Sequence, residues 1–124
     1  MGSEGEGIIS SAHFAEGYDS PATKKFVEEY QAAYKYLPSI YGFAHYSAAL
    51  WIAQAINAVN GNVEDRPAFL EAIRKVALTE SPLGRPVKLD AYGNPIYDVF
   101  IRNTVKRPDG KLWNVPIETY PEVT

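Results

Sequence analysis

The chain has 124 residues, the length of one compact domain. Hydrophobic residues make up 46% of it and charged residues 22%, which is ordinary for a globular protein, and a formal net charge of -3 is too small to indicate a charged partner. No basic stripe interleaved with aromatic residues occurs, which argues against nucleic-acid binding. No apolar run is long enough for a membrane span. Because cysteine is absent, disulfides, thiolate nucleophiles and cysteine metal sites are excluded.

Residues 1–7 are acidic and rich in glycine, and they lack both the basic start and the apolar centre of a secretion signal. We therefore interpret residues 1–7 as a leader or a cloning remnant. The organised part of the chain is predicted to cover residues 8–119, and residues 120–124 are predicted to form a tail without an element of its own.

A short β-branched strand over residues 8–11 is predicted to precede three helices. The first helix covers residues 21–36, because Ser20 is a good N-cap and Pro21 suits the first helical position. Its apolar positions recur at helical spacing and comprise Phe26, Tyr30, Ala33, Tyr34 and Leu37.

The second predicted helix, over residues 40–60, is apolar nearly all round, which is typical of a helix that is buried on most sides. The third predicted helix begins after the N-cap residue Asp65 and ends by Thr79. Its predicted inward residues are Phe69, Leu70, Ile73, Val76 and Ala77.

The last third of the chain is predicted to form β-strands. Residues 87–89 form a short strand and residues 90–95 a turn. Residues 97–106 alternate apolar and polar side chains, as a half-buried strand does, and residues 112–118 return after a Pro-Asp-Gly turn. This hairpin is too small to cover three helices. We therefore expect that part of the fold is missing or that a second copy of the chain supplies the cover.

The sequence offers little support for enzymatic chemistry. His13 and His45, the only histidines, lie on separate elements, and no zinc-binding, serine-nucleophile or phosphate-loop motif is present. Glu28 and Glu29 are adjacent on a helix and point to different faces, so they cannot form an acid/base pair. We therefore predict no catalytic residue, metal or cofactor. His13, in a loop before a helix, is the better functional candidate, whereas His45 is interpreted as a hydrogen-bonded core residue.

An ordered set of short motifs resembles a known family. The segments are 7–11, the Asp-Ser-Pro-Ala of 19–22, 26–30, Pro38 with 44–48, 69–73, Ser-Pro-Leu-Gly at 81–84, 87–90 with Gly93, and 101–105. Together they are similar to the carboxy-terminal part of the type I solute-binding proteins, the branched-chain amino acid binding type. The resemblance covers nearly all of residues 7–119. It departs at Ser47, where many members carry an acidic residue.

The resemblance implies an α/β fold of two lobes, of which this chain matches the final part and would be α+β in isolation. Three helices would belong to the first lobe, and the final strands would cross toward the second. Most of the sheet that covers the helices would lie outside this chain. Since an exposed apolar face favours self-association, we expect a homodimer or a larger assembly.

The implied function is capture of a small solute between closing lobes, followed by delivery to an ABC permease in the periplasm or outside the cell. The residues expected to contact the solute are Ser11, His13, Phe14, Tyr18 and Tyr46. The aromatic surplus favours an amino acid or an aromatic carboxylate. Two alternatives stay open: a ligand-sensing domain of a receptor or regulator, and a small self-associating α+β interaction module.

Overall fold

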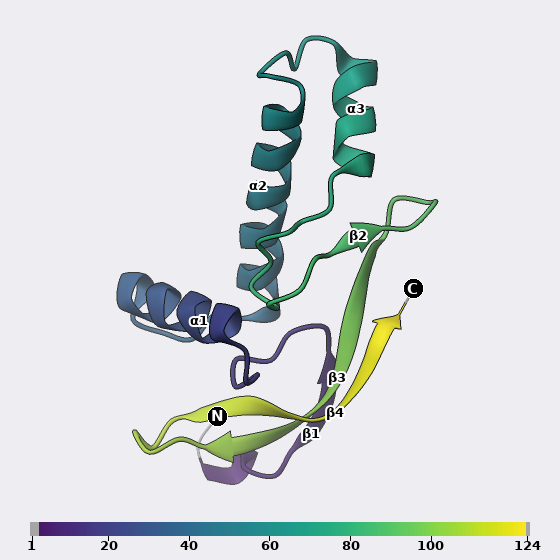
Figure 1. Ribbon diagram of the computed structural model, residues 1–124. Coiled ribbons are helices and arrows are strands. Elements are labelled where there is room, and N and C mark those ends of the chain that lie inside the picture. Colours follow the sequence, from purple (N-terminus) through teal and green to yellow (C-terminus); the bar gives the residue numbers. More distant parts are fainter. Residues whose placement is uncertain (1–2, 124) are drawn as a thin grey trace.

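The computed structural model describes residues 3–123 and combines a helical part with an antiparallel sheet (Figure 1). A short 3-10 turn, η1 (Ser3–Gly5), and strand β1 (Ile9–Ala12) come first. They are followed by the helices α1 (Pro21–Tyr34), α2 (Ile40–Ala58) and α3 (Arg66–Lys75). The strands β2 (Lys88–Leu89), β3 (Pro95–Lys106) and β4 (Leu112–Val123) complete the chain. The predicted element order and the mixed α and β class are confirmed.

Local capping explains where the helices begin. Ser39 precedes α2, and its hydroxyl accepts the N–H of Gly42 at 3.2 Å. Asp65 caps α3 as predicted, because its carboxylate accepts the N–H of Ala68 at 3.2 Å. Ser20 occupies the N-cap position of α1, but its side chain makes no capping hydrogen bond, so Pro21 is the clearer start signal there.

The sheet is organised around β3. Strand β1 pairs antiparallel with its second half, with Ser10 opposite Arg102, and β2 pairs with its start. Strand β4 pairs antiparallel along the other edge, with two register shifts that accompany the bend of the long ribbon in Figure 1. The long central strand therefore joins the helical end of the molecule to the hairpin tip.

The hydrophobic core lies where the helices meet the start of the sheet. Phe14, Phe43 and Phe100 are fully buried in it, and Leu78 and Val87 extend it through a short antiparallel bridge. The rings of Phe14 and Phe43 stack at 4.7 Å between centroids, and Phe26 meets Phe14 edge-on at 5.9 Å. These aromatic contacts hold α1, α2 and the segment after β1 together.

The prediction that α2 is buried on most sides is wrong for this chain. Helix α2 buries one stripe, at Phe43, Ser47, Trp51 and Ala55, which follows the i, i+4 spacing of a single face. Its other faces are exposed, and Tyr41 is 77% accessible. The reason is tertiary, because α1, α3 and the sheet contact only one side of the helix. His45 is likewise exposed rather than part of the core, with its Nδ1 atom 2.8 Å from the Tyr41 carbonyl oxygen.

Two smaller differences concern which residues of α1 and α3 are buried. Helix α1 buries Thr23, Phe26 and Val27 near its start, whereas Ala33 and Tyr34 are exposed. Leu70 on α3 is also exposed, although Phe69 and Ile73 are partly buried. Ala33 and Tyr34 lie at the end of α1, beyond its buried residues, and Leu70 lies mid-helix on the exposed side of α3.

Residues 120–123 belong to β4 rather than to an unstructured tail, because the extended β3 offers them a partner and Tyr97 pairs with Val123. The N–H of Glu122 also donates to the Asp98 carboxylate at 2.9 Å. At the other end, the N–H of Gly7 donates to the Thr104 carbonyl at 2.8 Å. Residues 1, 2 and 124 lie outside the described residues, and the interpretation of residues 1–7 as a leader stays a prediction.

Within residues 3–123 there is no helix of the length and apolarity that a membrane crossing requires.

Candidate functional site

The crossing segment, residues 9–20, carries most of the predicted solute contacts. Arg102 lies beneath it and holds it in place. Its Nη1 atom donates to the Phe14 carbonyl at 2.8 Å, and its Nη2 atom donates to the Ser10 hydroxyl at 3.1 Å. Farther along, the N–H of Gly17 donates to the Asn114 carbonyl at 2.9 Å. The crossing segment therefore leaves the β1 edge, passes over β3 and reaches β4.

His13 stands at the exposed side of this segment in an aromatic setting. Its ring stacks on Tyr97 with centroids 4.7 Å apart and an interplanar angle of 16°, and Phe43 lies 5.8 Å away. Burial first, and then the positive charge of Arg102, lower the pKa of His13 below its ordinary value. His13 is therefore neutral at neutral pH, with one ring nitrogen able to donate and the other able to accept a hydrogen bond.

The other predicted contact residues fall into different environments. Ser11 is exposed on β1, where it pairs with Ile101. Phe14 is fully buried in the core. Tyr18 is partly buried against Phe100, with ring centroids 4.8 Å apart. Ser11 is therefore accessible and His13 is half-buried, whereas Phe14 is a core residue in this structure.

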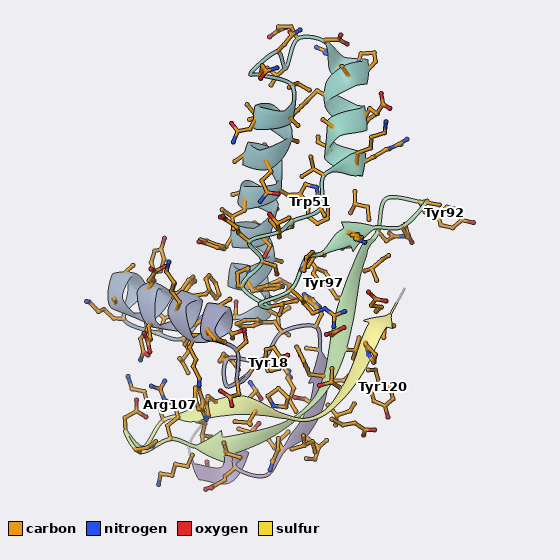
Figure 2. All side chains as sticks on the ribbon, viewed as in Figure 1. Tyr18, Trp51, Tyr92, Tyr97, Arg107 and Tyr120 are labelled. Carbon is orange, nitrogen blue, oxygen red and sulfur yellow. The ribbon has the colours of Figure 1, made fainter. Side chains whose placement is uncertain are left out.

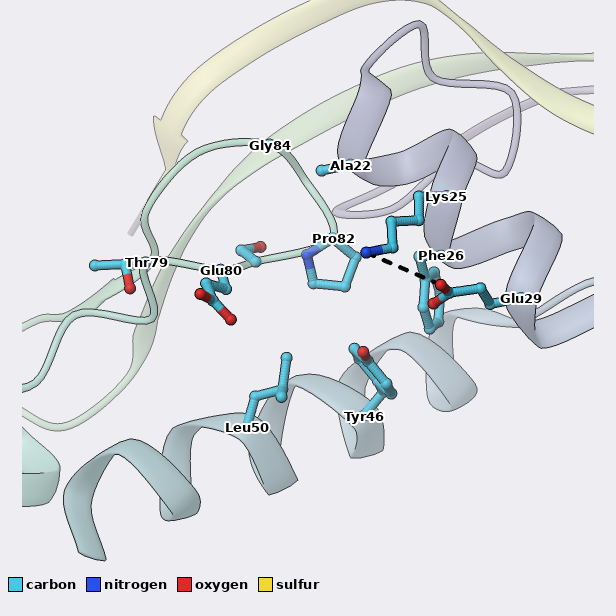
Figure 3. Close-up of a pocket in the computed structure, with 11 residues that line it drawn as sticks. Ala22, Lys25, Phe26, Glu29, Tyr46, Leu50, Thr79, Glu80, Pro82 and Gly84 are labelled. Atoms are coloured by element: carbon cyan, nitrogen blue, oxygen red, sulfur yellow. Dashed lines mark ion pairs between the residues drawn. The ribbon is translucent and has the colours of Figure 1, made fainter. Parts of the chain in front are cut away.

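Tyr46 lies apart from the crossing segment's exposed side. It packs on Phe26 at 4.9 Å and lines a cavity of about 480 Å³ between α1, α2 and the loop after α3 (Figure 3). Lys25 and Glu29 lie on its α1 side with a nitrogen–oxygen separation of 4.0 Å, and Glu80 lies on the loop side. The polar rim of this cavity differs from the aromatic surroundings of His13.

Two aromatic residues, Trp51 on α2 and Tyr97 on β3, were not predicted as part of a site (Figure 2). Tyr97 was interpreted only as an inward strand residue, yet its ring covers His13, and burial raises its pKa. Trp51 was interpreted only as one of many apolar residues on α2. Its indole N–H donates to the Ile73 carbonyl at 3.0 Å, which fixes the ring. The residues next to a tyrosine at the start of a strand do not indicate which distant side chains it will contact.

Tyr97 and Trp51 also line a second hollow, which we call the Trp51 recess. It has a volume of about 300 Å³ and lies between α2, α3 and the turn that joins β2 to β3. Its lining is almost entirely apolar and consists of Ala44, Ser47, Ala48, Trp51, Ile52, Ile73, Leu89, Gly93, Pro95 and Tyr97. Tyr97 borders this recess and also stacks on His13, whereas His13 and Ser11 are not part of the lining of the recess.

Metal ligation has no structural support in residues 3–123, because no group of three or more histidine, aspartate or glutamate side chains there is arranged to hold an ion.

Comparison with known proteins identifies the family. A family model for periplasmic binding proteins matches residues 1–110, most of the chain. The chain belongs to the periplasmic binding protein family. The expected resemblance to the type I solute-binding proteins is thereby confirmed.

Individual relatives agree with this assignment. The Leu/Ile/Val-binding protein homolog 6 of Brucella abortus is 29% identical over 97% of the chain. An ABC transporter substrate-binding protein from Sphaerobacter thermophilus superposes with a TM-score of 0.87 and 25% identity over 98% of the chain. A solute-binding protein of Rhodopseudomonas palustris in complex with 4-hydroxybenzoate superposes with a TM-score of 0.80 and 32% identity over 97%.

The chain spans about a third of the length of these relatives. It covers 31% of the Brucella protein, 33% of the Sphaerobacter structure and 32% of the Rhodopseudomonas structure. The match therefore concerns one continuous part of the periplasmic binding protein fold.

Proposed function

We propose that this chain supplies part of the solute site of an ABC importer's binding protein, with the exposed side of the crossing segment at the floor of the cleft. The observation that carries the proposal is the half-buried His13, stacked on Tyr97 and two residues after the exposed Ser11. A preformed site with a few polar groups among aromatic side chains is typical of small-molecule recognition.

The chemistry of this place favours a small acid that carries a ring. Ser11 can donate a hydrogen bond to a carboxylate or carbonyl oxygen, and neutral His13 can donate one as well. The relatives include both a Leu/Ile/Val-binding homologue and a protein in complex with 4-hydroxybenzoate. Because Tyr97 and His13 offer ring faces, we propose an aromatic carboxylate as the first candidate and a branched-chain amino acid as the second.

The proposal extends to how the intact site works. Since the relatives are three times as long as this chain, we propose that further chain in the same protein forms the opposing wall, and that the two lobes close over the solute without covalent chemistry. The same proposal includes delivery of the solute to a membrane permease and a location in the periplasm or outside the cell. It also includes additional solute contacts by Tyr18 and Tyr46. A ligand-sensing role with the same cleft stays an alternative prediction.

The test is a titration of the ¹⁵N-labelled chain with benzoate, 4-hydroxybenzoate and leucine, followed by NMR. We expect weak binding, because one wall of the cleft is supplied by other residues. The largest shifts should fall at Ser11, His13 and Tyr97. The variant His13→Ala should weaken the binding of the aromatic acids by about tenfold, which corresponds to the loss of one good polar contact.

The matched control is His45→Ala, which removes the exposed histidine on α2 and should leave the titration unchanged. Shifts that avoid residues 9–20 and Tyr97 would overturn the proposed site. Calorimetric titration gives a second check: sub-micromolar binding by the monomeric chain would contradict the proposal that the cleft needs a second wall.

A further inference from the structure

Arg102 on β3 is a buried positive charge that is bonded to the segment carrying the proposed solute contacts. We infer that Arg102 is a positioning and charge-selecting residue of the site: its hydrogen bonds fix the segment that carries Ser11 and His13, and its charge favours a solute with a negative group. The inference rests on the proposed function and adds to it the residue that distinguishes an acid from a neutral molecule of the same shape.

The hydrogen bonds of Arg102 enclose the proposed contacts on both sides. Its Nη2 atom donates to the Ser10 hydroxyl at 3.1 Å, and its Nη1 atom donates to the Phe14 carbonyl oxygen at 2.8 Å. Ser11 and His13 lie between these two points of the chain. Because the guanidinium is planar and rigid, it fixes the distance between the two points and holds the intervening backbone in one conformation. Such preorganisation lowers the cost of binding a solute.

The charge of Arg102 has no opposite charge beside it. The residue is 8% exposed, and none of the ion pairs within residues 3–123 includes it. Both of its acceptors are neutral oxygens, and its buried Nε atom has no hydrogen-bond partner in the same part of the chain. Since a buried charge without a partner is costly, an anion that binds nearby is favoured.

Two acids that could neutralise Arg102 are committed to other groups. Asp98 faces the same buried side of β3, but it lies about 13 Å away along the strand and binds Arg85 at 2.6 Å. Glu16, in the crossing segment, accepts the N–H of Asn114 at 3.1 Å. Neither carboxylate forms an ion pair with Arg102, so its charge remains available to a solute.

This positive charge acts at the proposed site. Burial is the larger cause of the lowered pKa of His13, and the charge of Arg102 is the second cause. A potential that disfavours a proton on His13 favours a carboxylate at the same place, because the two charges are opposite in sign. The half-buried position strengthens the effect, since salt and water screen charges less there.

The first test compares benzoate with benzamide, which has the same ring and no charge, in an NMR titration of the unmodified chain. We expect both solutes to shift the signals of Ser11 and His13, and benzoate to bind about tenfold more tightly. Equal affinities for the two solutes would overturn the charge-selecting role.

Arg102→Gln removes the charge. The preference for benzoate should fall to within about twofold, and the pKa of His13, followed by its ring signals, should rise but stay below 6.5 because burial remains. Arg74→Gln is the matched control, because it removes the same charge from an exposed position on α3. It should change neither the preference nor the pKa of His13.

Ser10→Ala tests the positioning role separately, because it keeps the charge and removes one hydrogen bond. It should weaken the binding of benzoate and benzamide alike, by about threefold, without changing the preference between them. No loss for either solute would overturn the positioning role. If Arg102→Gln does not fold, Ser10→Ala and the comparison of the two solutes in the unmodified chain decide.

The outcomes for Arg102 and for the proposed function are distinguishable. If Ser11 and His13 respond to benzoate while Arg102→Gln alters neither the preference nor the pKa of His13, the role of Arg102 is wrong and the proposed function stands. If neither solute shifts the signals of Ser11, His13 or Tyr97, both are wrong.

Discussion

His13 links the chemistry of the proposed site to the stability of the fold. Its ring is packed between Tyr97 and Phe43 and lies near the buried guanidinium of Arg102. Protonation would place a second positive charge there, at a site that burial already makes unfavourable for charge. A neutral His13 is therefore part of the folded arrangement.

Lowering the pH is expected to destabilise the chain through His13. The folded pKa lies below the ordinary value of 6.5, so the unfolded state binds the proton more readily. The stability contributed by His13 is thus present above pH 6.5 and is lost as the pH falls through the lower folded pKa. Urea unfolding across this range should show the decline, and His13→Gln should remove it.

The control for this pH dependence is His45→Gln, which should retain the slope because His45 is exposed. Hydrogen bonds from Lys24, Lys75 and Asn94 lower the pKa values of the Asp19, Glu71 and Asp90 carboxyls from their already acidic ordinary values, so these groups protonate at more acidic pH. An unchanged slope in His13→Gln would show that another group titrates in this window.

At the scale of elements, the crossing segment connects β1 to the helices and is bound to both β3 and β4. It joins β1 to α1 and contacts β4 at Asn114, where the Gly17 N–H donates to the Asn114 carbonyl and the Glu16 carboxylate accepts the Asn114 N–H at 3.1 Å. A Cβ atom built on Gly17 would lie 2.7 Å from Val115 Cγ2 and 2.9 Å from the Asn114 carbonyl oxygen. Glycine is required here by close approach rather than by its backbone angles.

Gly17→Ala is therefore expected to destabilise the chain by about 1–3 kcal/mol, the usual cost of an overpacked contact. Val115→Ala in the same chain should recover part of this loss, because the nearer clash is with the valine side chain. A double-mutant cycle by chemical denaturation measures the coupling.

Gly93→Ala serves as the comparison for this cycle. Gly93 has a φ of +90° with open space around it, so alanine there suffers only backbone strain and should show no coupling to Val115→Ala. Additive effects of Gly17→Ala and Val115→Ala would contradict the proposed contact.

At the scale of the whole molecule, α2 exposes apolar side chains on the sides away from its buried stripe. Tyr41, Ala49 and Ala53 are accessible on this helix, and so is Ile52 at the edge of the Trp51 recess. A helix that is apolar on several faces normally has neighbours on several sides. The described residues cover one face only, so we predict that α2 packs against another surface in the functional protein.

In the isolated chain this exposure is expected to cause self-association. Ala49→Lys with Ala53→Lys should shift sedimentation profiles toward the monomer, because the two lysines lie one turn apart on the exposed side. The thermal midpoint should change little, since both positions are accessible. Tyr92→Lys, at a 91% exposed turn residue, is the control that should leave association unchanged. A chain that is monomeric at every concentration would refute the prediction.

Much of the local structure was predictable from the sequence. Pro21 and Asp65 mark helix starts because a missing N–H and a capping carboxylate act within one turn. The alternation across residues 97–106 identified β3 because side chains of a strand point to opposite faces by geometry. The ordered motifs predicted the family, and they placed Ser11 and His13 near one another because both lie in the same short segment.

Tertiary structure decided the rest. The packing of elements that are distant in the chain decides that α2 buries one face and that Tyr46 lines a different cavity. It also decides that Tyr97 stacks on His13. Periodicity says which side chains share a face, but it does not say what covers that face. The sequence by itself determined the elements, because their rules act over a few residues. The surroundings of His13 were decided by its contacts with Phe43 and Tyr97, since those contacts exist only once the core has packed.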